Sequence, residues 1–245
     1  SVTVSSQKVE FVFDKKDGFV NSYKIDGFQY IKNGFGFRPN FWRGPTDNDY
    51  GNGFPDRNHF WKERSRKFKI KSIETAENDN SVILTVIYTL LHDSDMNIEF
   101  KIVYCVFSCG IIKVDLYYTY STIEDEDENE DKDKDEDKDD DDDDNDDVYL
   151  DADTIPRIGF RFHLPPELHN VVYFGRGPEE NYTDRCSGTQ IGLYKTTAED
   201  LYYPYVRPQE NGHHVDTRWL SFDNDSKSNG LLISADKLIE FNALR

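Results

Sequence analysis

Apolar and polar residues alternate along most of this chain. Successive side chains of a β-strand point to opposite faces of its sheet, so alternation over several residues is typical of a half-buried strand. In the first half of the chain, such stretches are rich in β-branched and aromatic residues and predict strands at residues 2–6, 8–13, 19–23, 28–31, 68–73, 81–91, 96–107 and 111–120. In the second half they predict strands at residues 158–164, 170–174, 192–196, 217–222 and 230–234. With one short helical turn expected at residues 59–66, the pattern indicates an all-β chain folded as a large antiparallel sandwich of two sheets.

The stretch at residues 38–53, RPNFWRGPTDNDYGNG, interrupts this alternation. Its prolines and glycines argue against a helix and break any strand, so an ordered loop is expected. Phe41 and Trp42 favour burial, whereas the polar side chains beside them need partners. Two interpretations stay open, a structural loop whose polar groups cap neighbouring strands and a ligand-facing surface. The polar residues concerned are Arg43, Asp47, Asn48 and Asp49.

The acidity of the chain is concentrated in one block. The formal charge is −19 over 245 residues, but residues 124–147 hold 19 acidic residues and 3 lysines, a net charge of −16. The remaining residues together carry only −3, and nothing is basic enough to predict a nucleic-acid partner. The block lacks apolar side chains that could offset its ordering entropy, so we expect a disordered insert in a hairpin loop. The expected organisation is one sandwich domain, formed by residues 1–123 and 148–245 and interrupted by the insert at 124–147.

The three cysteines indicate the redox state of the compartment in which the protein is found. Cys105, Cys109 and Cys186 are odd in number and have no metal-ligand spacing. Cys105 and Cys109, at ~3.3 Å per residue of strand, would lie about 13 Å apart, too far for a disulfide. A reducing compartment, the cytoplasm, is therefore expected. No secretory signal and no transmembrane run is visible, so no membrane partner is predicted.

Three stretches together resemble a known family. They are the loop at 38–53, FGRGPEENYTDR at residues 174–185, and YVRPQENGHHVDTRWL at residues 205–220. In this order they are similar to the small-chain, or C-terminal sandwich, domain of the β-galactosidases of glycoside hydrolase family 2. The resemblance covers residues 18–234 apart from the acidic block. It implies a super-sandwich related to the galactose mutarotases, with further strands beyond residue 245, so we expect a domain truncated at its C-terminal end.

The resemblance also implies a function. In this family both catalytic glutamates lie on a (β/α)8 barrel that precedes the sandwich, and no strand–helix alternation of barrel length occurs here. We therefore expect no catalytic residue in this chain, but a fragment or small subunit of an enzyme that hydrolyses terminal β-galactosides with retention. The implied partners are the β-galactoside, the barrel domain or large subunit, and further copies of the chain in a homo-oligomer. The implied cofactors, Mg and Na, belong to the full enzyme, and no metal site is expected in this chain.

The motifs supply candidates for a carbohydrate-binding surface or an interface with the barrel. Glycoside hydrolysis needs two carboxylates at a set separation, but the carboxylates here are expected to satisfy backbone N–H groups and arginines instead. Arg176, Arg185 and Arg207 lie near acidic residues in sequence and predict an ion-pair lattice that holds the loops together. The candidates are Trp42, Arg43, Asp47, Asn48, Asp49, Arg176, Glu180, Asn181, Asp184, Arg185, Glu210, Asn211 and His213.

Other functions stay open at this point. One is a stand-alone carbohydrate-binding or interaction module without hydrolytic activity. Another is a mutarotase-like epimerase, with His213 as general acid and Glu210 as base. Adjacent histidines on a strand point to opposite faces, which argues against His213 and His214 binding one metal ion. An alternative interpretation of the acidic block is that it binds a basic partner or cations.

Overall fold

The computed structural model describes residues 1–90, 96–122 and 155–245. The acidic block at residues 124–147, and with it the prediction of a disordered insert, lies outside the described residues. None of the helices in the described ranges is long and apolar enough to cross a membrane.

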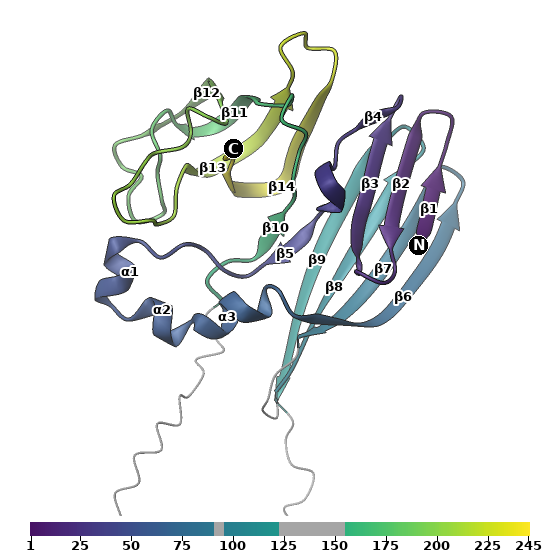
Figure 1. Ribbon diagram of the computed structural model, residues 1–245, viewed down its shortest axis with the longest axis horizontal. Helices are drawn as coiled ribbons and strands as arrows, with labels where there is room; N and C mark the ends of the chain where they lie inside the picture. The colour runs from purple at the N-terminus through teal and green to yellow at the C-terminus, as the bar shows by residue number, and fades with distance from the viewer. Residues whose placement is uncertain (91–95, 123–154) are drawn as a thin grey trace, which may run out of the picture.

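Two four-stranded antiparallel sheets face each other and form a sandwich (Figure 1). The first has the order β1-β2-β3-β4 and comprises β1 Val2–Ser5, β2 Val9–Asp14, β3 Phe19–Ile25 and β4 Phe28–Gln29. The second has the order β6-β7-β8-β9 and comprises β6 Phe68–Asn78, β7 Ser81–Leu90, β8 Met96–Phe107 and β9 Ile112–Thr122. Tight turns join neighbouring strands. At one of them Asp26 and Gly27 both have positive φ, as a two-residue hairpin loop requires.

A third sheet lies apart from this sandwich, and a two-stranded ribbon lies between them in Figure 1. The third sheet has the order β12-β11-β13-β14 and comprises β11 Asn170–Gly177, β12 Gln190–Thr197, β13 His213–Asp223 and β14 Gly230–Asn242. The ribbon pairs β5 Arg38–Asn40 with β10 Gly159–Arg161. The predicted all-β sandwich class is confirmed, but in the described residues the strands belong to four separate sheets rather than to two continuous ones.

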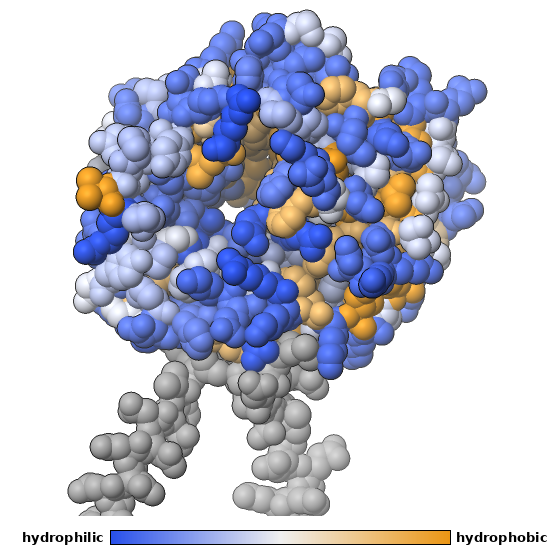
Figure 2. Space-filling model, viewed as in Figure 1, coloured by the Kyte–Doolittle hydropathy of each residue, from blue (hydrophilic) through white to orange (hydrophobic). Residues whose placement is uncertain are grey.

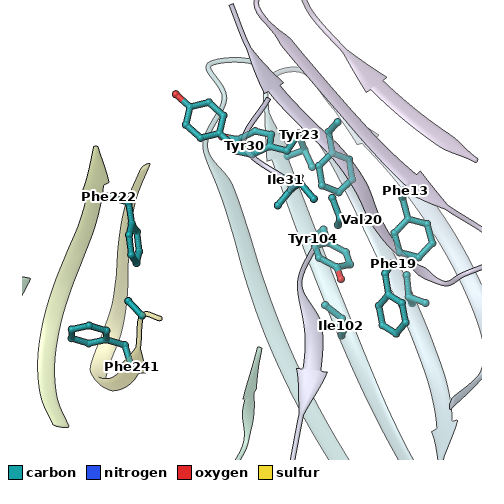
Figure 3. Close-up of a cluster of buried hydrophobic side chains, with 14 of the residues drawn as sticks. Phe13, Phe19, Val20, Tyr23, Tyr30, Ile31, Ile102, Tyr104, Phe222 and Phe241 are labelled. Atoms are coloured by element: carbon teal, nitrogen blue, oxygen red, sulfur yellow. The ribbon is translucent and has the colours of Figure 1, made fainter. Parts of the chain in front are cut away.

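Aromatic rings fill the space between the two sandwich sheets. Phe19 stacks on Tyr88 with ring centroids 5.7 Å apart, and Tyr88 stacks on Phe100 at 4.6 Å. Phe13 meets Tyr104 from the opposite sheet at 6.1 Å. Figure 3 shows Phe13, Phe19 and Tyr104 between the sheets and, separated from them, Phe222 and Phe241 on the third sheet. The burial of these large apolar surfaces is the main free-energy term that favours folding here.

Two strands extend well beyond their predicted bounds. β13 begins at His213 rather than at residue 217, and β14 continues to Asn242 rather than ending at residue 234. The pairing of these strands shifts register between His214 and Thr217 and again before Trp219, and Asp216 has a φ of 53°. A bulge inserts an extra residue and reverses the faces beyond it. Alternation is therefore lost at the bulges, which is where the predicted β13 began too late and the predicted β14 ended too early.

The motif loop at 38–53 was predicted to exclude a helix, and this was wrong. It begins with the short strand β5, and a chain of short helices follows from residue 47 onward. Thr46 caps the first helix. Its hydroxyl accepts from the N–H of Asp49, and the Asp49 carboxylate accepts from the N–H of Thr46 at 2.7 Å. This reciprocal capping box offsets the poor helix propensity of the segment. The helical elements are η1 Lys32–Gly34, α1 Asp47–Gly51, α2 Phe54–Arg57 and α3 His59–Arg64, the last confirming the turn predicted at 59–66.

Truncating a core leucine should destabilise the fold far more than truncating an exposed one. Leu84 on β7 is fully buried, whereas Leu193 on β12 is 59% exposed. We expect Leu84→Ala to lower the free energy of unfolding by about 2–5 kcal/mol, because it removes buried methyl groups and leaves a cavity. Leu193→Ala should cost less than about 1 kcal/mol. Urea unfolding of both variants measures the difference, and equal losses would contradict the assigned core.

Candidate interface formed by three motif loops

Two aromatic residues fix the first motif loop to the core. Phe41 is fully buried, and its ring lies 5.8 Å from that of Trp61 and 5.6 Å from that of Phe100. Its N–H donates to the Ser65 hydroxyl at 2.9 Å. Trp42 is half-buried and lies 5.4 Å from the Phe54 ring. These ring contacts hold the loop against the core.

Arg43 and Asp49 form a two-pronged ion pair inside the first loop. The guanidinium donates to both carboxylate oxygens, one bond being 2.9 Å long. Thr46 adds its N–H and its hydroxyl to one of the same oxygens. Burial opposes ionisation of Asp49, but the hydrogen bonds from Arg43 and Thr46 outweigh it and lower its pKa. Asp49 is therefore a structural anion, and Arg43 is held rigidly by it.

Glu210 joins the first and third motifs. One carboxylate oxygen accepts from the N–H of Gly44 at 2.8 Å, and the other accepts from Arg157 at 2.7 Å. A Cβ on Gly44 would lie 2.9 Å from the backbone nitrogen of Glu210, so only glycine permits this approach. The second motif joins the same point, because the Tyr182 hydroxyl donates to the backbone carbonyl of Glu210 at 2.9 Å.

Glu180 makes the corresponding link between the second and third motifs. Its carboxylate accepts from the N–H of Gly212 at 2.7 Å and from Arg185 at 2.9 Å. The hydroxyl of Tyr205 donates to the oxygen that also receives Arg185. The carboxylate thus fixes a backbone group and two side chains from neighbouring loops.

A buried amide and a further arginine hold the second motif to β13. Asn181 is fully buried, and its Nδ2 donates to the carbonyls of Arg176 and Glu179, while its Oδ1 accepts from the N–H of Val215. The guanidinium of Arg176 donates to the carboxylate of Asp216 at 2.9 Å. All the polar atoms of the Asn181 side chain are therefore engaged, so the amide has a structural role.

His213 is buried at one end of β13 and bonded on both ring nitrogens. Nδ1 lies 3.1 Å from Asn242 Oδ1, and Nε2 lies 3.1 Å from Glu240 Oε2. The hydrogen bond from His213 lowers the pKa of Glu240. The ring also stacks on Tyr182 with centroids 5.2 Å apart. His214 contacts other groups, among them the Tyr173 ring at 4.9 Å, so the two histidines have separate surroundings.

The remaining candidates lie at the periphery. Asp47 meets Arg207 at 3.4 Å in an exposed pair, while Asn48 and Asp184 are exposed. Asn211 uses its side-chain amide to hold the backbone of Tyr203, from which Oδ1 accepts at 2.9 Å. These four residues therefore surround the hydrogen bonds made by the Glu180 and Glu210 carboxylates and take no part in them.

The ion-pair lattice exists, but most of its partners differ from those that sequence proximity suggested. Arg185 pairs with its sequence neighbour Glu180, whereas Arg176 pairs with Asp216 and Arg207 with Asp47. Sequence reading missed Arg157, Glu240 and Asn242, which belong to no motif and reach the site from strand β14 or from the segment before β10. It also missed an exposed apolar group around the start of the third motif, and no alternation or charge pattern marked it. That group is Tyr202, Tyr203 and Val206, of which Val206 is fully exposed.

A large hollow opens beside the motif loops. Its volume is about 2330 Å³, and its lining includes the polar residues Arg43, Glu210 and His213. Apolar residues of β9, β10 and β14 also line it. Figure 2 shows an opening near the middle of this face, ringed mostly by hydrophilic side chains with hydrophobic ones visible inside it. Within the described ranges of the chain, no group of three or more His, Cys, Asp or Glu could hold a metal ion.

Comparison with known proteins gives a consistent result. A family model described as the beta galactosidase small chain matches residues 5–245. The β-galactosidase of Priestia megaterium is 30% identical over 244 residues, which are 100% of this chain and 20% of that protein. That of Streptococcus thermophilus is 28% identical, over 100% of this chain and 21% of that protein. That of Kluyveromyces lactis is 25% identical, over 98% and 21%. The chain spans about a fifth of the length of these curated relatives.

The Glu210–Arg157 pair should show strong energetic coupling in a double-mutant cycle. The Glu210 and Arg157 side chains are 7% and 21% exposed. We expect Glu210→Gln and Arg157→Gln to be coupled by about 1–3 kcal/mol, because removal of one partner leaves the other charge poorly compensated. The exposed pair Glu199 and Arg245 serves as the control and should couple by about 0.2–1 kcal/mol. Urea unfolding of the single and double variants gives both values. Equal coupling in the two cycles would remove the distinction.

Loss of the Asp49 charge should destabilise the chain in a pH-dependent way. Its folded pKa lies below the ordinary value of 3.8, so its contribution is present above that value and is lost as the pH falls through the folded pKa. We expect Asp49→Asn to lower the free energy of unfolding by about 1.5–3 kcal/mol at pH 7, with a difference that shrinks as the pH falls below about 4. The exposed Asp47→Asn variant should change it by less than about 0.5 kcal/mol. A difference between wild type and Asp49→Asn that is constant with pH would contradict the role of the charge.

Proposed function

The chain belongs to the β-galactosidase small-chain family, and we propose that it is the non-catalytic sandwich portion of a β-galactosidase. It would act as a fragment of a longer enzyme or as a separate small subunit. The whole enzyme would hydrolyse terminal β-galactosides with retention of configuration. Its acid/base and nucleophile would come from a barrel part outside this chain, which corresponds to the four-fifths of the relatives that this chain does not span.

The state of the motif carboxylates is the observation that carries this proposal. A retaining glycosidase needs two carboxyl groups about 5–5.5 Å apart, facing an open cleft and free to exchange a proton or form a bond. Asp49, Glu180 and Glu210 each accept hydrogen bonds from an arginine and from a backbone N–H. Carboxylates held in this way are suited to building loops and are poorly suited to proton transfer.

The exposed apolar group around the start of the third motif supports contact with the rest of the enzyme. Tyr202 and Tyr203 are 54% and 60% exposed, and Val206 is fully exposed. The guanidinium of Arg207 lies beside them, 5.4 Å from the ring centre of Tyr50. Aromatic residues and arginine are enriched in protein interfaces, and exposed apolar groups of this kind are typical of contact surfaces. We assign this group to the contact with the barrel part.

A stand-alone carbohydrate-binding module is the second candidate. The hollow favours it, because a concave surface with apolar walls and a few convergent polar groups is typical of ligand sites. A mutarotase-like epimerase receives less support. Both ring nitrogens of His213 and both carboxylate oxygens of Glu210 already have partners, so acid–base chemistry would first have to break those bonds.

Metal ions and compartment follow from the same proposal. The Mg and Na that the resemblance implies for the full enzyme would, on this proposal, be held by the barrel part. Cys105, Cys109 and Cys186 are free thiols, which supports a reducing compartment such as the cytoplasm.

The mass and activity of the native polypeptide test the proposal. An antibody against residues 124–147 would isolate it from cells for intact-mass measurement and for assay with a nitrophenyl β-galactoside. We expect either a mass several times that of this chain or a co-purifying barrel subunit, with hydrolysis in both cases. Purified residues 1–245, shown to be folded by circular dichroism, should not hydrolyse the substrate. Turnover by this chain alone, or a native chain of this size without a partner, would reject the proposal.

The contact surface has its own control in the same assay. Val206→Asp should weaken the association of the chain with the barrel part, because it places a charge in an apolar contact. Leu193→Asp likewise replaces an exposed aliphatic residue by aspartate, but on β12, and it should leave association unchanged. An effect of both variants would point to folding rather than to contact.

A further inference from the structure

Three arginines gather at the ribbon between the sandwich and the third sheet. Arg38 and Arg161 lie directly opposite each other in the pairing of β5 with β10, so their side chains share a face. Their guanidinium carbons lie 4.7 and 5.9 Å from the centre of the same ring, that of Phe35. Burial lowers the pKa of the Arg161 guanidinium, and the positive charges of Arg66 and Arg38 lower it further. Arg66, just beyond α3, therefore belongs to the same cluster.

This cluster is not balanced by carboxylates in the way the motif loops are. Within residues 1–90, 96–122 and 155–245, neither a hydrogen bond nor an ion pair joins Arg38, Arg66 or Arg161 to an acidic side chain. The Nε–H of Arg38 is buried and has no acceptor among the described residues. Like charges directly opposite on paired strands are destabilising. The arrangement therefore carries an electrostatic cost in the described part of the chain.

Aromatic rings and backbone bonds hold the arginines in place despite this cost. The Arg38 guanidinium lies between the rings of Phe19 and Phe35, 4.6 and 4.7 Å from their centres. The His163 ring stacks on Phe35 at 4.1 Å. The N–H of His163 donates to the Phe35 carbonyl at 2.8 Å, which fixes the two segments to each other. Arg66 and Arg161 are exposed as whole residues, although the Arg161 guanidinium is partly buried, so the cluster can be reached from solvent.

We infer that Arg38, Arg66 and Arg161 form a binding site for an oxyanion, whose negative charge offsets their mutual repulsion. Guanidinium groups donate two parallel hydrogen bonds to phosphate or carboxylate, and a rigid cluster of them loses little entropy on binding. Arg38 begins the first motif loop, but the site is distinct from the nearby ion pairs in which Arg43, Arg157 and Arg176 already have carboxylates. It does not depend on the proposed function. The oxyanion has two sources, free phosphate and the side-chain carboxylates of this chain's own acidic residues.

Thermal unfolding in inorganic phosphate tests the inference, with sodium chloride of equal ionic strength as the reference. We expect phosphate at several times its dissociation constant to raise the Tm of the chain by about 2–4 °C over chloride. Arg161→Gln should abolish this rise, and in chloride it should not lower the Tm, because it relieves repulsion. Arg66→Gln is a second variant with the same expectation. Arg245→Gln removes an exposed arginine that pairs with Glu199, and it should retain the phosphate response.

A second chain separates the two sources of the oxyanion. It carries glycine and serine in place of residues 124–147, the segment with 19 acidic residues. A phosphate response that is larger in this chain than in the wild type would mean that those carboxylates compete for the site. An equal response would mean that free phosphate binds without competition. The inference is overturned if neither chain responds to phosphate beyond chloride, or if the response survives in both Arg161→Gln and Arg66→Gln.

Discussion

The motif side of this molecule depends on two carboxylates, one buried and one half-buried, that accept hydrogen bonds from the backbone of neighbouring loops. A loop outside any sheet leaves its N–H groups without ladder partners, and a buried N–H without an acceptor costs about 1–3 kcal/mol. Glu210 and Glu180 supply that acceptor to Gly44 and Gly212. Each carboxylate also has an arginine, so its own charge is compensated. The close approach of the loops follows from these bonds.

The same chemistry explains why the two groups of arginines behave differently. In the motif loops an arginine is the counter-charge of an acid that the backbone requires, so the local charge is balanced. At the ribbon, the cross-strand pair Arg38 and Arg161 is held by rings instead, and cation–π attraction contributes only about 0.5–2 kcal/mol. Ring contacts reduce the repulsion without removing the positive charge. A positive surface therefore persists on a chain whose net charge is strongly negative.

The sequence predicted the elements that local pattern controls. Strands such as β7 and β8 follow from alternation alone, because one of their faces is buried along the whole strand. Alternation failed at the bulges of β13, where an extra residue reverses the faces. The helix α1 follows from its capping box, a signal that was present in Thr46 and Asp49 but outweighed by the count of glycines and prolines. The side-chain pairs of the motif loops could not be predicted from the sequence. Glu210 and Arg157, for example, are 53 residues apart, and no local pattern relates them.

The sheet topology gives these side-chain bonds a mechanical role. The third sheet shares no hydrogen-bonded strand pair with the sandwich in the described residues. Loop contacts centred on Glu210, where Gly44 from the first motif meets the third, are among those that join the two parts. The hollow lies between these parts and begins at the same contacts. Near the motif loops the hollow is bordered by the Glu210 ion pair, and apolar side chains of β9, β10 and β14 form part of its other walls. Bonds that build the motif surface therefore also form part of the wall of the hollow.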